Sequence, residues 1–166
     1  MLQISKSNLT PPRENQWINK GDKIEIQFTV DKPILFHGVH LFGHGENELY
    51  EVTTNSGNRS IYRSRYFKNH TSNSDSQSYS NTSYSGFDVL LPSPVLVTAN
   101  QPVTLFYTIK GPNSYYGVNG KSSVEVCGVK VQFTRRGCSP CSGYSQDRTD
   151  VYTGQIYAIF ISHCDK

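Results

Sequence analysis

Long apolar runs and dense runs of like charge are both missing from this 166-residue chain. Its apolar stretches, such as Ile34–Phe36 and Tyr157–Ile161, fall far short of the roughly 18 residues that a membrane-spanning helix needs. The N-terminus lacks the apolar segment of a secretory signal. We therefore expect no membrane association and no export signal in these residues, and we predict a cytoplasmic location.

Charge is also sparse. Lys and Arg number 16 against 13 Asp and Glu, which gives a net charge of +3, and no segment gathers five like charges. Proteins that bind nucleic acid usually concentrate basic residues in a patch or stripe. The sequence therefore predicts no nucleic-acid partner.

Paired metal-binding motifs are missing as well. The four cysteines are Cys127, Cys138, Cys141 and Cys164. Only Cys138 and Cys141 have the close spacing of a zinc or redox pair, and a structural zinc site needs a second such pair. On a regular strand His37 and His40 would point to opposite faces, with no carboxylate or cysteine to complete a metal site. We predict four reduced thiols and no bound metal.

Catalytic motifs are not evident. The chain has no phosphate-binding glycine loop, no Gly-x-Ser-x-Gly elbow and no His-Glu-x-x-His motif. A thiol-dependent enzyme that uses Cys138 and Cys141 is an alternative hypothesis, with Arg135, Arg136 and Arg148 as the nearby positive charges. We predict no enzyme, no catalytic residue and no cofactor.

The clearest pattern that is present lies in residues 24–43. Apolar and polar residues alternate strictly from Ile24 to Val30, which is the period of a strand with one buried face. The turn-forming segment Asp31–Pro33 follows, and a second apolar segment begins at Ile34. The pattern predicts a hairpin, and Gly38 in its second strand indicates a bulge or a close backbone contact.

Short strand candidates recur along the chain and are separated by turn residues, whereas no helical period is sustained. They are Leu49–Thr54, Ile61–Phe67, Gly86–Leu91, Val95–Thr98, Val103–Ile109 and Gln155–Ser162. The sequence predicts an all-β fold with little helix: a two-sheet antiparallel β-sandwich of the jelly-roll type, with a closed barrel as the alternative. Residues 17–166 are expected to form one domain after an extended arm over residues 1–16. Trp17, the only tryptophan, is expected to anchor that arm by packing.

Residues 69–85 differ in composition from the rest. Of these 17 residues, 12 are Ser, Asn or Thr, and none is aliphatic. Such a segment can bury little apolar surface. We predict a flexible loop between strands.

The loop from Lys110 to Gly120 combines shape-fixing glycines with polar and aromatic side chains. The predicted partner-binding residues are Lys110, Asn113, Ser114, Tyr115 and Tyr116, with His44 from the loop Gly43–Glu48 beside them. Rigid aromatic side chains are favoured anchors at protein interfaces. For one of the two tyrosines, a bracing role within the sandwich remains the alternative. The predicted structural residues are Trp17, Gly38, Gly43, Gly111, Gly117 and Gly120.

Several segments, taken in order, resemble the PHR domain, a family named after the Pam and Highwire ubiquitin ligases. The similar segments are Ile26–Lys32, Gly38–Gly43, Lys110–Gly117 with Gly120, and Gly154–Ile156, with Trp17 where the family often has a tryptophan. The resemblance implies an antiparallel β-sandwich that binds a protein or peptide. It also implies a link to ubiquitin-ligase components through a parent chain, because the family includes adaptors with BTB and BACK segments.

An extracellular carbohydrate-binding sandwich is the alternative function. Four N-glycosylation sequons support it, at Asn8, Asn58, Asn69 and Asn81. Such sequons also arise by chance in a chain rich in Asn, Ser and Thr. We therefore favour a non-enzymatic protein-interaction domain.

Overall fold

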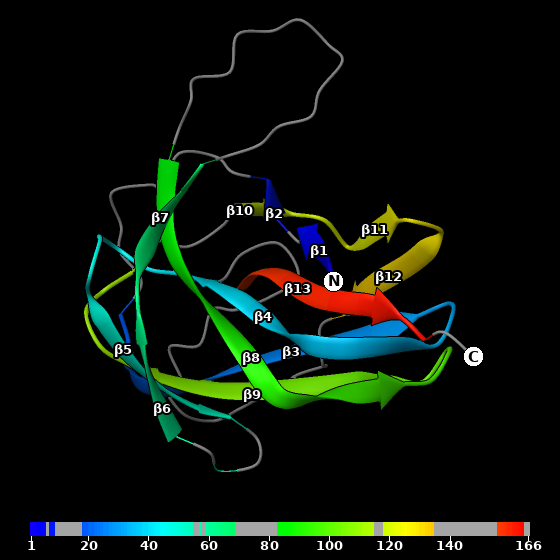
Figure 1. The fold of residues 1–166 in the computed structure, drawn as a ribbon, viewed down its shortest axis with the longest axis horizontal. Coiled ribbons are helices and arrows are strands. Elements are labelled where there is room, and N and C mark those ends of the chain that lie inside the picture. The colour runs from blue at the N-terminus through cyan, green and yellow to red at the C-terminus, as the bar shows by residue number, and fades with distance from the viewer. Residues whose placement is uncertain are drawn as a thin grey trace, which may run out of the picture.

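The computed structural model (Figure 1) describes residues 1–5, 7–8, 18–54, 57, 59–68, 83–114, 118–134 and 156–164. All regular structure in these ranges is extended, and none of it is helical. The strands are β1 (Leu2–Ser5), β2 (Ser7–Asn8), β3 (Lys20–Val30), β4 (Ile34–Phe42), β5 (Leu49–Thr54), β6 (Arg59–Arg63), β7 (Arg65–Lys68), β8 (Ser83–Val97), β9 (Val103–Lys110), β10 (Val118–Gly120), β11 (Ser123–Val126), β12 (Val129–Thr134) and β13 (Ile156–His163).

Two antiparallel sheets carry the fold. One has the strand order β1-β13-β4-β8-β7 and the other the order β11-β12-β3-β9-β5-β6, while β10 and β2 form a small separate pair. Each large sheet ends, within the described residues, in strands that have a neighbour on one side only. The prediction of an all-β, two-sheet antiparallel sandwich is confirmed, and the two sheets do not close into a single barrel.

The core lies between the two sheets. In β3 the alternating residues Ile24, Ile26, Phe28 and Val30 are all buried, as their pattern predicts. The Phe28 ring, which is fully buried, packs between Phe36 and Phe133 with ring centroids 5.8 and 6.3 Å away. Burying one such side chain contributes about 1.5–3 kcal/mol to stability.

The predicted hairpin of β3 and β4 is wrong, because the two strands belong to different sheets. The turn between them is fixed instead to the β11–β12 hairpin. The Asp31 carboxylate accepts a hydrogen bond from the Lys130 amide at 2.8 Å, and the Lys32 ammonium donates to the Gly128 carbonyl at 2.6 Å. Alternation identifies a strand but not its partner, so the sequence could not distinguish a hairpin from a crossing between sheets.

Gly38 interrupts β4 with the expected irregularity. The register of β4 shifts next to Gly38 against both neighbours, β13 and β8. A Cβ atom at this position would overlap the Val89 carbonyl oxygen, so the close backbone contact is also confirmed. The shift moves the inward positions from Phe36 to Val39, and both His37 and His40 then lie on the outer face of the sheet. The prediction that these histidines point to opposite faces is wrong for that reason.

The segment Ile61–Phe67, predicted as one strand, divides at the buried residue Ser64. Before it, β6 pairs with β5 in the six-stranded sheet, and after it, β7 pairs with β8 in the five-stranded sheet. The Ser64 amide and hydroxyl both bond to the loop that precedes β5, donating to Glu48 O at 2.9 Å and to Gly45 O at 2.5 Å. The chain therefore crosses between the two sheets at Ser64.

The loop predicted over residues 69–85 ends too late. Residues 83–85 begin β8, where Tyr84 and Ser85 pair with Phe67 and Tyr66 of β7, and both Tyr84 and Ser85 are buried. Residues 69–82 lie outside the described part of the chain. β8 then runs to Val97 as one strand, where two shorter strands were predicted; Pro92 lies at the shift in its register against β4.

The predicted arm over residues 1–16 is described only in part. Residues 2–5 are extended, as expected, but as β1 they pair with β13 and so belong to the edge of a sheet. β13 lies between β1 and β4, which agrees with its apolar residues at both parities. Trp17 lies outside the described residues, so its anchoring role stays a prediction.

Candidate functional site

The two loops predicted to form the binding site lie at the same end of the sandwich. Lys110 ends β9 and lies opposite Glu51 of β5, while the loop Gly43–Glu48 leads directly into β5. The register of β5 on β9 therefore brings the loop after Lys110 beside the loop before Leu49. We call this part of the surface, Gly43–Glu48 together with Lys110–Ser114, the loop end.

Tyr50 joins the two loops. Its hydroxyl lies 3.2 Å from the Glu48 carboxylate and 3.4 Å from the Asn113 carbonyl, and it can donate to either. The ring is fully buried and stacks on Phe87 with centroids 4.9 Å apart. Burial, and then the negative charge of Glu48, raise the pKa of Tyr50 well above its usual value. The hydroxyl therefore stays protonated and remains a donor.

Asn19 braces the second loop from within. Its side-chain amide donates to the Pro112 carbonyl at 2.8 Å and to the Ser114 hydroxyl at 3.1 Å. Its main-chain carbonyl accepts a hydrogen bond from the Gly111 amide at 3.1 Å. Asn19 and Ser114 are both buried. A Cβ at Gly111 would come within 2.9 Å of the Leu49 carbonyl, so glycine permits this close approach to β5. The loop is thus built on β3 and β5.

These contacts divide the predicted site residues. Lys110 and Asn113 are exposed, and His44 is half-buried with its Nδ1 atom 3.5 Å from the Glu48 carboxylate. Ser114 is fully buried, so it supports the loop and presents no surface to a partner. Tyr115, Tyr116 and Gly117 lie outside the described residues. Two of the predicted structural glycines lie within strand contacts: the Gly43 amide donates to the Ser85 carbonyl, and Gly120 ends β10 opposite Ser7.

No sequence pattern indicated a role for Asn19 or Tyr50. Asn19 precedes a strand without any motif, and Tyr50 occupies an ordinary inward position of β5. Their roles depend on contacts with residues 63 to 95 positions away along the chain. Only the pairing of β5 with β9 and of β3 with β9 makes these contacts possible.

A second cluster surrounds His40 on the outer face of the five-stranded sheet. The His40 Nδ1 atom lies 2.5 Å from the Asp88 carboxylate, which also accepts a hydrogen bond from Arg65 at 3.2 Å. Aromatic rings lie around the imidazole with centroids 4.5–6.4 Å away; we call these residues the aromatic cluster: Phe67, Tyr84, Tyr157 and Phe160, with Phe42 packed against two of them.

The His40–Asp88 pair resembles the base and orienting acid of many hydrolases, but its surroundings differ from an active site. The Nε2 atom of His40 is buried and has no hydrogen-bond partner among the described residues. A Cβ at Gly86 would lie 2.7 Å from it, so backbone of β8 lies against the imidazole. No described serine or cysteine hydroxyl or thiol bonds to this nitrogen. The His40–Asp88 pair therefore fits a structural role, as a polar contact within the aromatic cluster.

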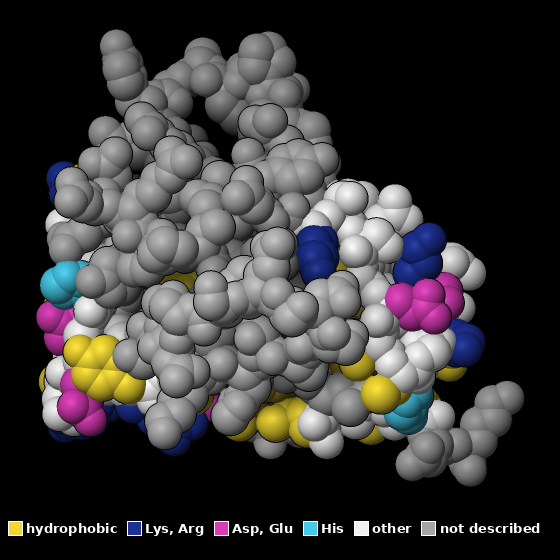
Figure 2. All heavy atoms as spheres, turned by 90° about the horizontal axis from the view of Figure 1, so that it is seen from above, with side chains coloured by type: hydrophobic (Ala, Val, Ile, Leu, Met, Phe, Trp, Pro, Cys, Tyr) yellow, Lys and Arg dark blue, Asp and Glu magenta, His cyan; other side chains and the backbone are white. Residues whose placement is uncertain are grey.

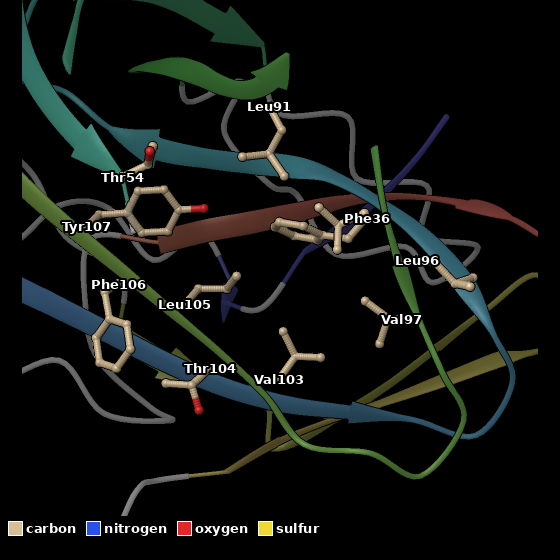
Figure 3. A pocket seen from close by; sticks show the side chains of 11 residues that line it. Phe36, Thr54, Leu91, Leu96, Val97, Val103, Thr104, Leu105, Phe106 and Tyr107 are labelled. Atoms are coloured by element: carbon tan, nitrogen blue, oxygen red, sulfur yellow. The ribbon is translucent and has the colours of Figure 1, made fainter. Parts of the chain in front are cut away.

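An apolar cavity of about 320 Å³ opens between β8 and β9. In Figure 3, Val103 and Leu105 point into the same space as Phe36, whereas Thr104 and Phe106 at the alternate positions of β9 point away from it. None of the lining side chains is charged. Substrate sites usually combine an apolar wall with a few convergent polar groups. The polar side chains that line this cavity carry hydroxyl groups: Thr54, Thr104 and Tyr107.

Metal-ligating side chains do not gather in the described part of the chain: nowhere in it do three His, Cys, Asp or Glu residues form a potential site. Cys127 and Cys164 are free thiols, while Cys138 and Cys141 lie outside the described residues.

No helix in the described residues is long and apolar enough to cross a membrane. Figure 2 shows one face, on whose coloured parts basic and acidic side chains are interspersed.

Comparison with known proteins agrees with this architecture. The chain is 30% identical over 146 residues to BTB/POZ domain-containing protein 6-A of Danio rerio, and 30% identical over 151 residues to BTB/POZ domain-containing protein 3 of Mus musculus and of Homo sapiens. These matches cover 87% of the chain but only about a quarter of the length of each relative, 24–25%. A family model for the PHR domain matches residues 12–161. The chain therefore belongs to the PHR domain family.

Proposed function

We propose that this domain is a non-catalytic recognition module that binds a protein or peptide segment through the loop end. The observation that carries the proposal is the support of both loops by buried Tyr50 and Asn19. Tyr50 contacts the Glu48 carboxylate in one loop and the Asn113 carbonyl in the other, and Asn19 bonds to Pro112 and Ser114. Binding residues placed on a rigid scaffold lose little conformational entropy when a partner docks. Exposed Lys110 and Asn113 then provide charge and hydrogen-bonding capacity on a preformed surface.

The relatives support the setting of this role. Their names identify them as BTB/POZ domain-containing proteins, and this chain aligns with about a quarter of their length. We infer that the domain recognises a substrate or partner on behalf of an adaptor chain that serves a ubiquitin ligase. Among the described residues, no hydroxyl or thiol bonds to the Nε2 atom of His40 and no charged side chain lines the apolar cavity, which favours recognition over catalysis.

A capture experiment with matched variants tests the proposal. The immobilised domain and two loop-end variants, Lys110→Glu and Asn113→Ala, are exposed to lysate of the native cell, and captured proteins are quantified. Lys130→Glu in β12 is the control, because it makes the same change of charge at an exposed residue of a different strand.

A partner of the loop end is captured by the unmodified domain and by Lys130→Glu but is depleted by both loop-end variants. Binding of the purified partner should then weaken by roughly 1–4 kcal/mol in Tyr115→Ala or Tyr116→Ala at an almost unchanged melting temperature. Capture that is equal in all variants would contradict the placement of the site at the loop end.

A further inference from the structure

The edge strand β6 is the starting point for a second binding surface, independent of the loop end. β6 ends the strand order of the six-stranded sheet, with β5 on one side and no partner strand on the other within the described residues. An unpaired edge presents a row of backbone donors and acceptors that another extended chain can use. This arrangement gives β6 the capacity to extend its sheet.

The hydrogen bond just after the end of β6 shows which of its backbone N–H and C=O groups point toward the open edge. The Ser64 amide donates to the Glu48 carbonyl at 2.9 Å, and this pair comes directly after the opposite residues Arg63 and Leu49. In an antiparallel ladder, hydrogen-bonded and non-hydrogen-bonded pairs alternate. Arg63 therefore belongs to the non-hydrogen-bonded set with respect to β5.

Applied to the rest of β6, the alternation assigns Ser60 and Tyr62 to the hydrogen bonds with β5. The N–H and C=O groups of the other three residues point away from β5, toward the open edge: Arg59, Ile61 and Arg63. The same three residues place their side chains on the outer face, because Tyr62 on the opposite face stacks on Phe87 at 5.8 Å. A strand docking at this edge would thus meet the unbonded backbone N–H and C=O groups of three residues at alternate positions.

The side chains at these positions define what such a strand should carry. Ile61 is 61% exposed and Arg59 is 64% exposed. Arg59 uses Nε to bind the Glu51 carboxylate at 3.0 Å, so its terminal nitrogens can still donate. Arg63 is exposed and forms no ion pair with the described residues. An apolar side chain thus lies between two guanidinium groups.

The edge lacks most of the features that normally prevent pairing. β6 contains no proline, and its register with β5 is regular, unlike β8, where Pro92 and Pro94 lie along the strand. Its arginines do, however, discourage a second copy of this chain. In an antiparallel pairing centred on Ile61, Arg59 of one copy would lie opposite Arg63 of the other, and like charges directly opposite are destabilising.

The neighbouring strands add charge of the same sign. Lys110 and Lys20 lie opposite one another in β9 and β3, and Lys110 is also opposite Glu51 of β5. All of these side chains lie on the outer face of the six-stranded sheet: Glu51 beside β6, where it pairs with Arg59, and Lys110 and Lys20 two and three strands away from β6. The positive potential on this face favours an acidic partner over a neutral or basic one.

We propose that β6 binds an extended segment of a partner protein by strand addition, and that this segment has an apolar residue flanked at two-residue spacing by acidic residues. Its backbone would bond to Arg59, Ile61 and Arg63, while its two carboxylates lie opposite the arginines and its apolar side chain opposite Ile61. This mode combines main-chain hydrogen bonds, which give affinity, with alternate side chains, which give specificity.

Fluorescence anisotropy with defined peptides tests the proposal. The probe is fluorescein-labelled Ser-Thr-Glu-Thr-Val-Thr-Glu-Thr-Ser, and the comparison peptides replace both glutamates with lysine or carry an N-methyl group on valine. The full chain should bind the probe saturably, and added salt should weaken binding. Both comparison peptides should bind at least roughly tenfold more weakly than the probe. One reverses the cross-strand charges, and the other removes a backbone donor.

Variants of β6 separate strand addition from general charge attraction. Ile61→Pro removes an N–H that β5 does not use, so it should abolish binding while the melting temperature changes by only a few degrees, as for other edge prolines. Arg63→Glu should lose the glutamate peptide and gain affinity for the lysine peptide. Lys130→Glu, with the same charge change on β12, should keep its affinity for the glutamate peptide within about twofold.

Three outcomes would overturn the proposal. The first is no saturable binding of the glutamate peptide, and the second is equal affinity for the N-methylated one. The third is a dimer of the unmodified chain in sedimentation that Ile61→Pro dissociates, since β6 would then serve self-association. If Ile61→Pro fails to fold, the Arg63→Glu exchange and the N-methylated peptide still decide the question.

Discussion

The inter-sheet core and the aromatic cluster around His40 lie on opposite faces of the same strand, β4, yet they are stabilised differently. The core is apolar, with side chains such as Phe28, Val39 and Leu41 packed from both sheets. The aromatic cluster encloses a polar pair, His40 and Asp88, among its rings. Loss of volume should therefore dominate the response of the core, and loss of a hydrogen-bond partner should dominate the response of the cluster.

The largest expected effect is in the core. Phe28→Ala removes a fully buried ring that packs against Phe36 and Phe133. The lost burial and the remaining cavity should lower the free energy of unfolding by about 3–5 kcal/mol. Urea denaturation measures this loss, and the exposed Ile61→Ala should stay within about 0.5 kcal/mol. A small effect of Phe28→Ala would show that the sheets collapse around the cavity.

The aromatic cluster should respond to Asp88→Ala. This change leaves the Nδ1 atom of buried His40 without its partner and also removes the Arg65 contact. We expect a loss of about 1.5–3 kcal/mol in urea denaturation, while the exposed Glu125→Ala should be close to neutral.

Adding His40→Leu to Asp88→Ala should recover part of that loss, because replacing both hydrogen-bonding partners by apolar groups can be nearly neutral. A double variant less stable than Asp88→Ala alone would show that the imidazole contributes mainly through its ring contacts.

Alkaline pH should affect both regions equally. Burial raises the pKa of Tyr107 in the core and of Tyr84 in the aromatic cluster well above the ordinary value of 10. Above pH 10 the unfolded chain loses these protons while the folded chain retains them, so stability should fall as pH rises, by up to about 1.4 kcal/mol per pH unit for each group. Tyr107→Phe and Tyr84→Phe should each reduce this slope; an unchanged slope in both would contradict the argument.

The smallest expected effect concerns the loop end. Tyr50→Phe keeps the ring stacked on Phe87 but removes the hydroxyl that joins the two loops. Stability should decrease by about 0.5–1.5 kcal/mol, whereas Tyr66→Phe at an exposed position should have little effect. Partner binding at the loop end should weaken as well, because the loops lose their shared support. Unchanged binding would show that the loops hold their shape without this bond.

The sequence predicted the strands more reliably than their neighbours. Alternation identified β3, β5 and β9 because burial on one face imposes a period of two residues. It did not reveal that β3 and β4 belong to different sheets, since the same turn residues serve a hairpin and a crossing. At the site, the proximity of the two loops was predicted, whereas the buried position of Ser114 was not. That position depends on Asn19, which no local pattern connects to residues 112–114.

The irregularity at Gly38 also determines which changes of length the domain can tolerate. Because the shift next to Gly38 adds one residue to β4, deleting Gly38 would restore strict alternation from Ile34 onward while Val39 and Leu41 keep their inward direction. Adding one residue between Gly38 and Val39 would instead turn Val39 and Leu41 outward, and His40 and Phe42 into the space between the sheets. The strand should therefore tolerate the loss of one residue at this point far better than the gain of one.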